Sequence, residues 1–323
     1  MTAQNPYSDV DRILSVLRCP QSGESLHRAG QVLANPSGSR SYRISATGIA
    51  LFAEEFLSPE AAAQQAHYEH IAEAYTANLE YPHTQEYTAY LDRALLDASG
   101  SDELGVCAEL CCGTGEALAL FRERIGTGIG VDVSAAMLVK AQLSFHGSRF
   151  CFVQGDATRL PLADNAFDTV VMLGGIHHVP NRVALFQQVF RVLKPGGLFL
   201  FREPVSDFWL WKFLRAIVYR LSPMLDHETE RPLLYKETVP VLEAAGFDRI
   251  EWRTFGFFGF CLFMNSDVLF VNRLFRFIPG IRAITRASAR FDDWCTRRSI
   301  LQRAGLQVIG SARKPAARSS NEQ

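Results

Sequence analysis

The middle of the chain alternates between short apolar runs and longer amphipathic stretches. Between residues 105 and 204, apolar runs typical of buried strands occupy 105–110, 127–132, 150–153, 168–173 and 197–202. Amphipathic stretches between them predict helices over 115–123, 134–145 and 181–193. Strict alternation of strand and helix favours a parallel sheet with helices on both faces. The expected fold class is therefore α/β.

The regions on either side of this core have different patterns. Residues 1–56 hold short apolar pieces between turn residues, which predicts a small β-rich module. Residues 57–104 begin with Ser58-Pro59-Glu60, a favourable helix start, and predict a helical cap. After the core at 105–204 we expect a helical insertion (205–236), the last two strands with an inserted aromatic helical lid (237–315) and a disordered tail (316–323). The last two strands bring the expected sheet to seven.

Composition and charge narrow the possible partners and the compartment. The net charge of -1 gives no general attraction to nucleic acid, so none is expected as a partner. The seven cysteines and the acidic N-terminus favour free thiols in a reducing cytoplasm. The longest uncharged apolar run, 254–266, is shorter than the roughly 20 residues of a membrane span.

A glycine loop carries the first chemical signal. The segment 109–116, ELCCGTGE, follows a strand and opens a helix, and its two glycines let the backbone approach a ligand closely. A phosphate-binding loop needs lysine and Ser/Thr after the last glycine, but Glu-Ala-Leu follows Gly115. A dinucleotide loop needs a small residue where Leu118 stands, and Glu116 would repel a pyrophosphate. S-adenosylmethionine (SAM) is cationic and has no phosphate, so it suits this loop.

Three acidic residues follow three successive strands. They are Glu109, Asp132 and Asp156. Because the carboxyl ends of parallel strands meet at one edge, these carboxylates are expected to line one crevice. Glu109 suits the cationic groups of SAM, Asp132 the ribose hydroxyls and Asp156 the adenine amino group. The constellation predicts a SAM site.

These segments resemble the class I SAM-dependent methyltransferases. ELCCGTGE is similar to their first motif, with Cys111 where glycine is more usual. GVDVSAAML, QGDATRLPL, FDTVVMLGGIHHV and RVLKPGGLFLFREP are similar to the later motifs, in order. The nearest subfamily is the ubiquinone/menaquinone-biosynthesis and small-molecule group, and the resemblance covers about residues 65–205. It implies a SAM-dependent methyltransferase with a Rossmann-like sheet.

The resemblance also implies which residues bind the cofactor. The first loop would hold the methionine part, Asp132 the ribose, and the segments after it the adenine, while two tyrosines before the core would close over SAM. The implied residues are Tyr68, Tyr75, Glu109, Leu110, Cys111, Gly113, Gly115, Asp132, Val133, Met137, Asp156, Ala157, Leu173 and Gly174. Ordinary helix packing is an equal alternative for the tyrosines, which stand seven residues apart.

Candidate catalytic residues follow the fourth and fifth strands of the core. His177 or His178 would act as the general base, because an imidazole titrates near neutral pH, and Glu203 is a lesser candidate. The alternative is that the histidine pair only shapes the pocket.

The N-terminal module resembles the zinc-ribbon-like domain of many bacterial methyltransferases, but in degenerate form. A ribbon needs two C-x-x-C pairs, whereas this module has Cys19 alone. One thiol cannot hold zinc, so no metal is expected. The lost ligands and the net charge also count against the alternative of a ribosomal RNA guanine methyltransferase.

The insertions predict the kind of acceptor. Aromatic residues gather at 208–213 and 255–277, which favours a small, largely hydrophobic acceptor: a secondary metabolite, a quinone or a lipid-like molecule. The alternative is that the insertions bury their aromatics against each other and against the N-terminal module. Arg273 and Arg276 allow at most peripheral membrane contact. A non-catalytic SAM-binding scaffold is the second hypothesis for function, and an NAD-dependent oxidoreductase a distant third.

Overall fold

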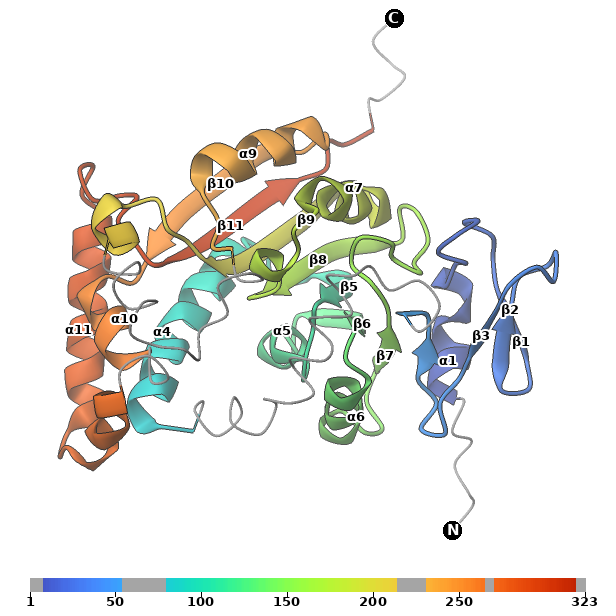
Figure 1. Cartoon of the computed structure of the whole chain (residues 1–323), viewed down its shortest axis with the longest axis horizontal. Helices are drawn as coiled ribbons and strands as arrows, with labels where there is room; N and C mark the ends of the chain where they lie inside the picture. Colours follow the sequence, from blue (N-terminus) through green and yellow to red (C-terminus); the bar gives the residue numbers. More distant parts are fainter. Residues whose placement is uncertain (1–7, 54–79, 214–230, 265–269, 318–323) are drawn as a thin grey trace, which may run out of the picture.

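The central sheet has the topology of a Rossmann-like fold. The computed structural model describes residues 8–53, 80–213, 231–264 and 270–317 (Figure 1). Within these ranges, eight strands form one sheet in the order β10-β11-β9-β8-β5-β6-β7-β4. Its parallel middle consists of β5 (Gly105–Leu110), β6 (Ile125–Asp132), β7 (Phe150–Gln154), β8 (Phe167–Leu173) and β9 (Leu193–Pro204). The α/β fold class and the five core strands are confirmed.

The last two strands complete one side of the sheet. β11 (Gln307–Arg313) runs antiparallel to both β9 and β10 (Asp248–Phe255). The order in which successive strands are added to the sheet reverses between β5 and β8. These two strands are neighbours in the sheet, although β6 and β7 separate them in the sequence. In open α/β sheets, ligands bind at the carboxyl ends of the strands beside such a switch point.

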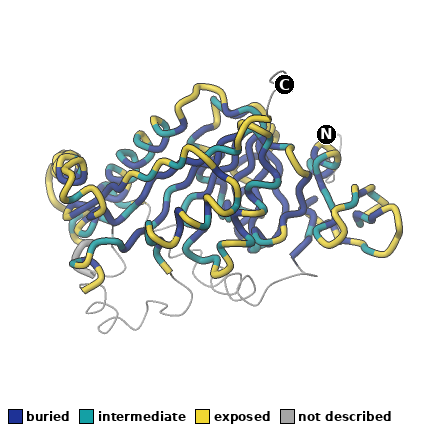
Figure 2. Tube along the Cα trace, turned by 90° about the horizontal axis from the view of Figure 1, so that it is seen from above, coloured by how far each residue is buried: buried dark blue, intermediate teal, exposed yellow. Residues whose placement is uncertain are grey.

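Helices cover both faces of the sheet. On one face lie α4 (Pro82–Ala98), α5 (Glu116–Leu120) and α6 (Ala135–Ser144), and the other face carries α7 (Arg182–Val192) and α9 (Tyr235–Ala244). Alternate strand residues enter the two cores, so Phe199 packs on the α7 side and Leu200 on the α4 side. Figure 2 shows the strands buried through the middle of the molecule.

Local capping explains where several helices begin. The Ser134 side chain accepts a hydrogen bond from the Met137 N–H at 3.3 Å and starts α6. Asn181 does the same for α7, accepting from the Ala184 N–H at 3.1 Å. Pro82 stands at the first position of α4, where a missing N–H costs nothing. These caps are properties of the local sequence.

The N-terminal module supplies the eighth strand, so the expectation of seven strands is wrong. After α1 (Ser8–Ile13) and η1 (Leu14–Val16), a three-stranded antiparallel sheet consists of β1 (His27–Ala29), β2 (Val32–Ala34) and β3 (Ser41–Arg43). The next strand, β4 (Ala50–Leu51), leaves this sheet and pairs in parallel with β7. Leu17, Leu33 and Phe52 share one hydrophobic core with Val153 of β7. The module covers an otherwise open sheet edge.

The C-terminal insertion lies at the opposite end of the molecule from the three-stranded sheet (Figure 1). It consists of α10 (Phe258–Phe263), η3 (Phe270–Phe277) and α11 (Ile281–Thr296), packed on α4. The described aromatics of the two insertions pack on each other, with Trp211 and Phe257 rings 5.3 Å apart. Contact with the N-terminal module, which we expected as one alternative, is not made by the described residues. No helix in the described ranges is long and apolar enough to cross a membrane.

Candidate active site

The loop after β5 is built from residues in left-handed conformations. Cys111, Gly113 and Gly115 have φ values of 51°, 50° and 87°. A Cβ on Gly115 would lie 2.7 Å from a ring carbon of Phe145, so only glycine fits there. Cys111 adopts the conformation that the more usual glycine takes without strain, at a cost of roughly 1–2 kcal/mol. The tight turn leads directly into α5.

Glu109 is buried beneath this loop and holds the first turn of α5. Its exposed fraction is 2%, and its two carboxylate oxygens accept the N–H groups of Ala117 and Leu118, each at 2.9 Å. Burial raises the pKa of Glu109 to about 8, although these two donors act in the other direction. Leu110, the next residue, is wholly buried in the core. Direct contact of Glu109 with SAM stays a prediction, whereas its role in positioning the loop is visible.

Asp132, at the end of β6, joins two loops of the site. One carboxylate oxygen accepts the Gly113 N–H at 2.8 Å, and the other accepts the Ser134 N–H at 2.8 Å. Burial raises the pKa of Asp132. A carboxylate oxygen has two lone pairs, so each oxygen keeps acceptor capacity for a ribose hydroxyl.

The remaining predicted cofactor residues surround these acids. After β7, Asp156 accepts both the N–H and the O–H of Thr158, at 2.8 and 2.7 Å, which fixes the turn that carries Ala157. The Met137 methyl group lies 3.4 Å from where a Gly113 Cβ would stand, so this side chain covers the loop. Val133 is half-buried at the start of α6, and Leu173 and Gly174 end β8. Tyr68 and Tyr75 lie outside the described residues.

The electrostatics of the loop fit a cationic ligand. Besides burial, the carboxylates of four residues raise the pKa of the Cys111 thiol: Asp132, Glu203, Asp156 and Glu109. Asp132, Asp156 and Glu203 stand at or just after the ends of three different strands, so negative charge gathers at one point on the carboxyl edge of the sheet. SAM carries a sulfonium and an ammonium against one carboxylate and is favoured there, whereas a pyrophosphate is repelled. The residues therefore fit SAM.

Glu203 and His177 form a buried carboxylate–imidazole pair. The Glu203 carboxylate is fully buried and accepts the N–H groups of Gly175 and Ile176, each at 2.8 Å. Its second oxygen lies 2.8 Å from His177 Nδ1. A carboxylate at this position makes Nδ1 the protonated nitrogen and leaves Nε2 as the basic one. Glu203 is thus placed to position His177 rather than to act as the base itself.

His178 lies against its neighbour in η2 (Ile176–His178). The two imidazole rings are 3.8 Å apart between centroids and tilted by 40°. The Arg231 N–H donates to the His177 carbonyl at 3.1 Å and ties this turn to the segment that precedes α9. The structure brings together the histidines and Glu203, which stand 25 residues or more apart in sequence.

The structure adds three residues that sequence reasoning missed. His83 of α4 is fully buried between Phe263 and Phe275, and neither ring nitrogen has a hydrogen-bond partner among the described residues. Arg202 of β9 pairs with Asp92 of α4 at 2.6 Å and ties that helix to the sheet beside Glu116. No local pattern marks these positions, because their partners lie far away in the chain.

The zinc-ribbon-like turn of the N-terminal module is held by hydrogen bonds. The Cys19 sulfur lies 3.0 Å from the Tyr42 hydroxyl and accepts the Ser22 N–H at 3.4 Å. In the part of the chain that the structure describes, no group of three His, Cys, Asp or Glu side chains is close enough to hold a metal ion.

Comparison with known proteins identifies the family. The sequence profile described as "Methyltransferase domain" matches residues 108–201. A demethylmenaquinone methyltransferase of Leptospira interrogans is 34% identical over 173 residues, which make up 46% of this chain and 70% of the relative. This chain belongs to the class I SAM-dependent methyltransferases. The methyltransferase is an enzyme and SAM is its cofactor.

Two further comparisons agree with this assignment. The methyltransferase is 27% identical over 208 residues to the ubiquinone/menaquinone biosynthesis C-methyltransferase UbiE of Idiomarina loihiensis, covering 57% of this chain and 79% of the relative. A SAM-dependent methyltransferase of Thermotoga maritima, described as a possible histamine N-methyltransferase, shares the fold with a TM-score of 0.51. That structure is 18% identical and aligns with 76% of this methyltransferase and 98% of its own chain.

Proposed function

We propose that the enzyme methylates a ring carbon of a small, hydrophobic, quinone-like acceptor. The observation that carries the proposal is the His177–Glu203 pair, with 2.8 Å between Nδ1 and the carboxylate, at the carboxyl edge of the sheet. The names of the relatives, demethylmenaquinone methyltransferase and C-methyltransferase, support a quinone-like ring and a carbon nucleophile. The aromatic insertion supports an apolar acceptor.

The chemistry requires the reduced form of such a ring. A quinol carbon beside a hydroxyl group is nucleophilic, whereas the carbon of an oxidised quinone is not. Bound SAM supplies the electrophilic methyl group. His177 Nε2 takes the hydroxyl proton while the ring carbon bonds to the methyl carbon and the sulfur–carbon bond breaks. Loss of the ring C–H proton then restores the aromatic ring, and the oxygen regains a proton from the His177 imidazolium, so one proton is released overall.

Glu203 orients the His177 ring and faces the imidazolium that forms when Nε2 takes the proton. A buried carboxylate has the same effect in other enzymes that use a histidine base. The N–H groups of Gly175 and Ile176 hold this carboxylate in place, and they belong to the turn that carries the histidines. The pair and its turn therefore move as one unit.

A reducing compartment completes the proposal. All seven cysteines are free thiols, and five of them are buried. We place the enzyme in the cytoplasm, where thiols stay reduced.

The test is an assay of S-adenosylhomocysteine formation with SAM and a reduced, demethylated naphthoquinol as acceptor. We expect turnover with the quinol, and none with the oxidised quinone or with ribosomal RNA. His177→Ala should lower turnover by about 10²–10⁴ while the SAM dissociation constant stays nearly unchanged. His146→Ala, at an exposed site just after the end of α6, is the matched control. SAM binding without turnover on any acceptor would support a scaffold instead.

A further inference from the structure

The outer side of α11 is divided into an apolar and a basic half. The inner side faces the protein and consists of Ile281, Thr285, Ala289, Asp292, Cys295 and Thr296. At 100° per residue, the solvent side then carries two stripes. One holds Ile284, Phe291 and Trp294, and the other holds Arg282, Arg286, Arg290 and Arg297. A helix that only covered a core would not need the first of these stripes.

The large apolar side chains of this half are exposed, and no contact among the described residues explains why they are apolar. Exposed fractions are 46% for Ile284, 51% for Phe291 and 54% for Trp294. The Phe291 and Trp294 rings stack on each other with centroids 6.0 Å apart. Shortly before the helix in the sequence, Phe277 is 69% exposed. Large apolar groups gathered in this way mark an interaction surface.

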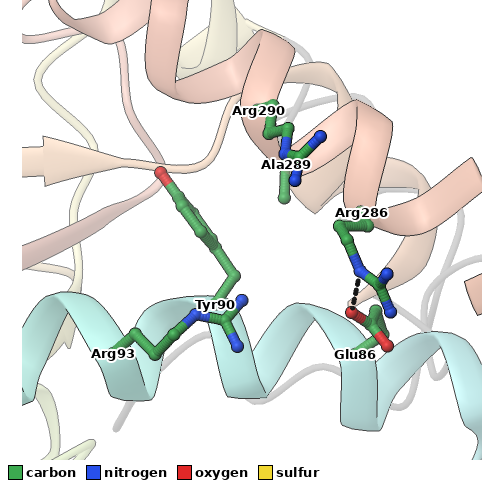
Figure 3. A pocket seen from close by; sticks show the side chains of 6 residues that line it. All are labelled: Glu86, Tyr90, Arg93, Arg286, Ala289 and Arg290. Carbon is green, nitrogen blue, oxygen red and sulfur yellow. Dashed lines mark hydrogen bonds and ion pairs between the residues drawn. The ribbon is translucent and has the colours of Figure 1, made fainter. Parts of the chain in front are cut away.

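The basic half opens into a groove between α11 and α4 (Figure 3). The groove has a volume of about 400 Å³ and is lined by Glu86, Tyr90, Arg93, Arg286, Ala289 and Arg290. Arg286 pairs with Glu86 at 2.8 Å, while Arg93 and Arg290 form no ion pair among the described residues. Residues 281–303 hold six arginines and two aspartates in a chain whose net charge is -1. Positive charge is concentrated at this end of the molecule.

We propose that this surface, the outer side of α11 with the arginine groove, binds the surface of an anionic lipid bilayer. The apolar stripe would enter the boundary between headgroups and acyl chains, and the arginines would contact lipid phosphates. Basic residues beside exposed Trp and Phe are the pattern of helices that lie in a membrane interface. This inference does not depend on which acceptor the enzyme methylates. Membrane binding would nevertheless bring the enzyme to apolar compounds dissolved in the bilayer.

Other partners fit the same surface less well. A second copy would bring like charges together, because Asp293, the partly exposed acid of α11, is already paired with Arg253 and Arg297 at 2.8 and 2.7 Å. A nucleic acid would satisfy the arginines but would leave Ile284, Phe291 and Trp294 against water. A bilayer with anionic headgroups satisfies both halves.

The test is sedimentation of the full-length enzyme with vesicles of phosphatidylcholine, with or without about one third phosphatidylglycerol. We expect binding to the anionic vesicles that weakens as salt rises, together with a blue shift of tryptophan fluorescence. Phe291→Ser/Trp294→Ser should lower the partition coefficient at least about tenfold. Arg93→Gln/Arg290→Gln should lower it about fivefold for each arginine.

The matched control is Lys140→Gln/Leu143→Ser on α6, which removes one charge and one side chain that is 76% exposed at a different part of the surface. It should bind vesicles like the wild type, and SAM affinity should be unchanged in every variant. Absence of binding, equal binding to neutral vesicles, or equal loss in the control would overturn the proposal. A dimer in sedimentation equilibrium that Phe291→Ser/Trp294→Ser dissociates, without vesicle binding, would assign the surface to a second copy.

Discussion

Asp132 holds two loops of the candidate site together and is also predicted to bind the ribose of the cofactor. It bridges the Gly113 and Ser134 N–H groups and retains lone pairs for the ribose. Asp132→Ala should weaken SAM binding by about 1–3 kcal/mol, the scale of a lost charge-assisted hydrogen bond. Isothermal titration measures this directly. Asp164→Ala, which removes an exposed carboxylate paired with Arg191, should leave the dissociation constant unchanged.

Glu109 is expected to behave differently from Asp132. Both of its oxygens hold the first turn of α5, so Glu109→Ala should lower the free energy of unfolding as well as SAM affinity. Asp132→Ala also leaves two backbone N–H groups without their acceptor, so chemical denaturation should show a loss for both variants, whereas titration with SAM should show the larger loss of affinity for Asp132→Ala. A loss of SAM affinity for Glu109→Ala as large as that for Asp132→Ala would contradict this distinction.

His83 makes stability depend on pH. Burial lowers its pKa below the ordinary value of about 6.5, so the folded state binds fewer protons than the unfolded state at mildly acidic pH. The stability that the protein gains by burying a neutral His83 is fully present above about pH 6.5 and is lost progressively as the pH falls below this value. Urea unfolding at pH 7.5 and pH 5.5 should show a smaller loss for His83→Leu than for the wild type. Equal losses would mean that the imidazole is protonated in the folded enzyme.

At the scale of elements, Asp292 joins two helices of the C-terminal insertion, α10 and α11, to α4. It is fully buried on α11 and accepts the N–H groups of Phe257, Gly259 and Phe260 at the start of α10, at 2.8, 3.0 and 2.9 Å. It also accepts the Tyr87 hydroxyl of α4 at 2.5 Å. Burial, followed by the Asp292 charge, raises the pKa of Tyr87, so this donor stays protonated. One side chain thus fixes α10 against two helices.

Asp292→Ala should therefore be strongly destabilising. It would leave four buried donors without an acceptor, and we expect a loss of about 3–5 kcal/mol in the free energy of unfolding. Asp293→Ala is the control at the next position, since its carboxylate is partly exposed and its ion pairs are worth about 1 kcal/mol or less. Thermal denaturation of both variants would show whether Asp292 organises the insertion, and a similar small effect of both substitutions would refute it.

For the whole molecule, the N-terminal module and the methyltransferase core share one hydrophobic interior. Leu17, with no exposed surface, belongs to the same cluster as Val153 and Leu162. Leu17→Ala should lower the free energy of unfolding by about 2–5 kcal/mol and shift the single calorimetric transition of the whole protein to lower temperature. Leu143→Ala at an exposed site should leave the free energy of unfolding unchanged within about 0.5 kcal/mol. A second, separate transition would show that the module unfolds on its own.

Much of the fold and of the cofactor site can be predicted from the sequence, because both depend on short-range patterns. Alternating runs locate β5 to β9, and Ser134 and Asn181 mark helix starts within a few residues. Gly115 signals a left-handed turn at a strand end. Acids placed directly after strands must meet at one edge once the sheet is parallel. Each inference uses only residues close together in the chain.

The tertiary structure decided the contacts between residues that lie far apart in the chain. By its place in the sequence, the strand at 50–51 is expected to belong to the N-terminal module alone. It pairs instead with β7, about 100 residues away, because that sheet edge is otherwise open. Glu109 is predicted to bind SAM, and the structure shows that its oxygens also accept the N–H groups at the start of α5. Glu203 reads as a possible base, yet the N–H groups after β8 and His177 surround it. The sequence determined which chemistry the enzyme performs, whereas the packing of distant segments decided which of the predicted site residues hold loops and helices in place, because those contacts join residues far apart in the chain.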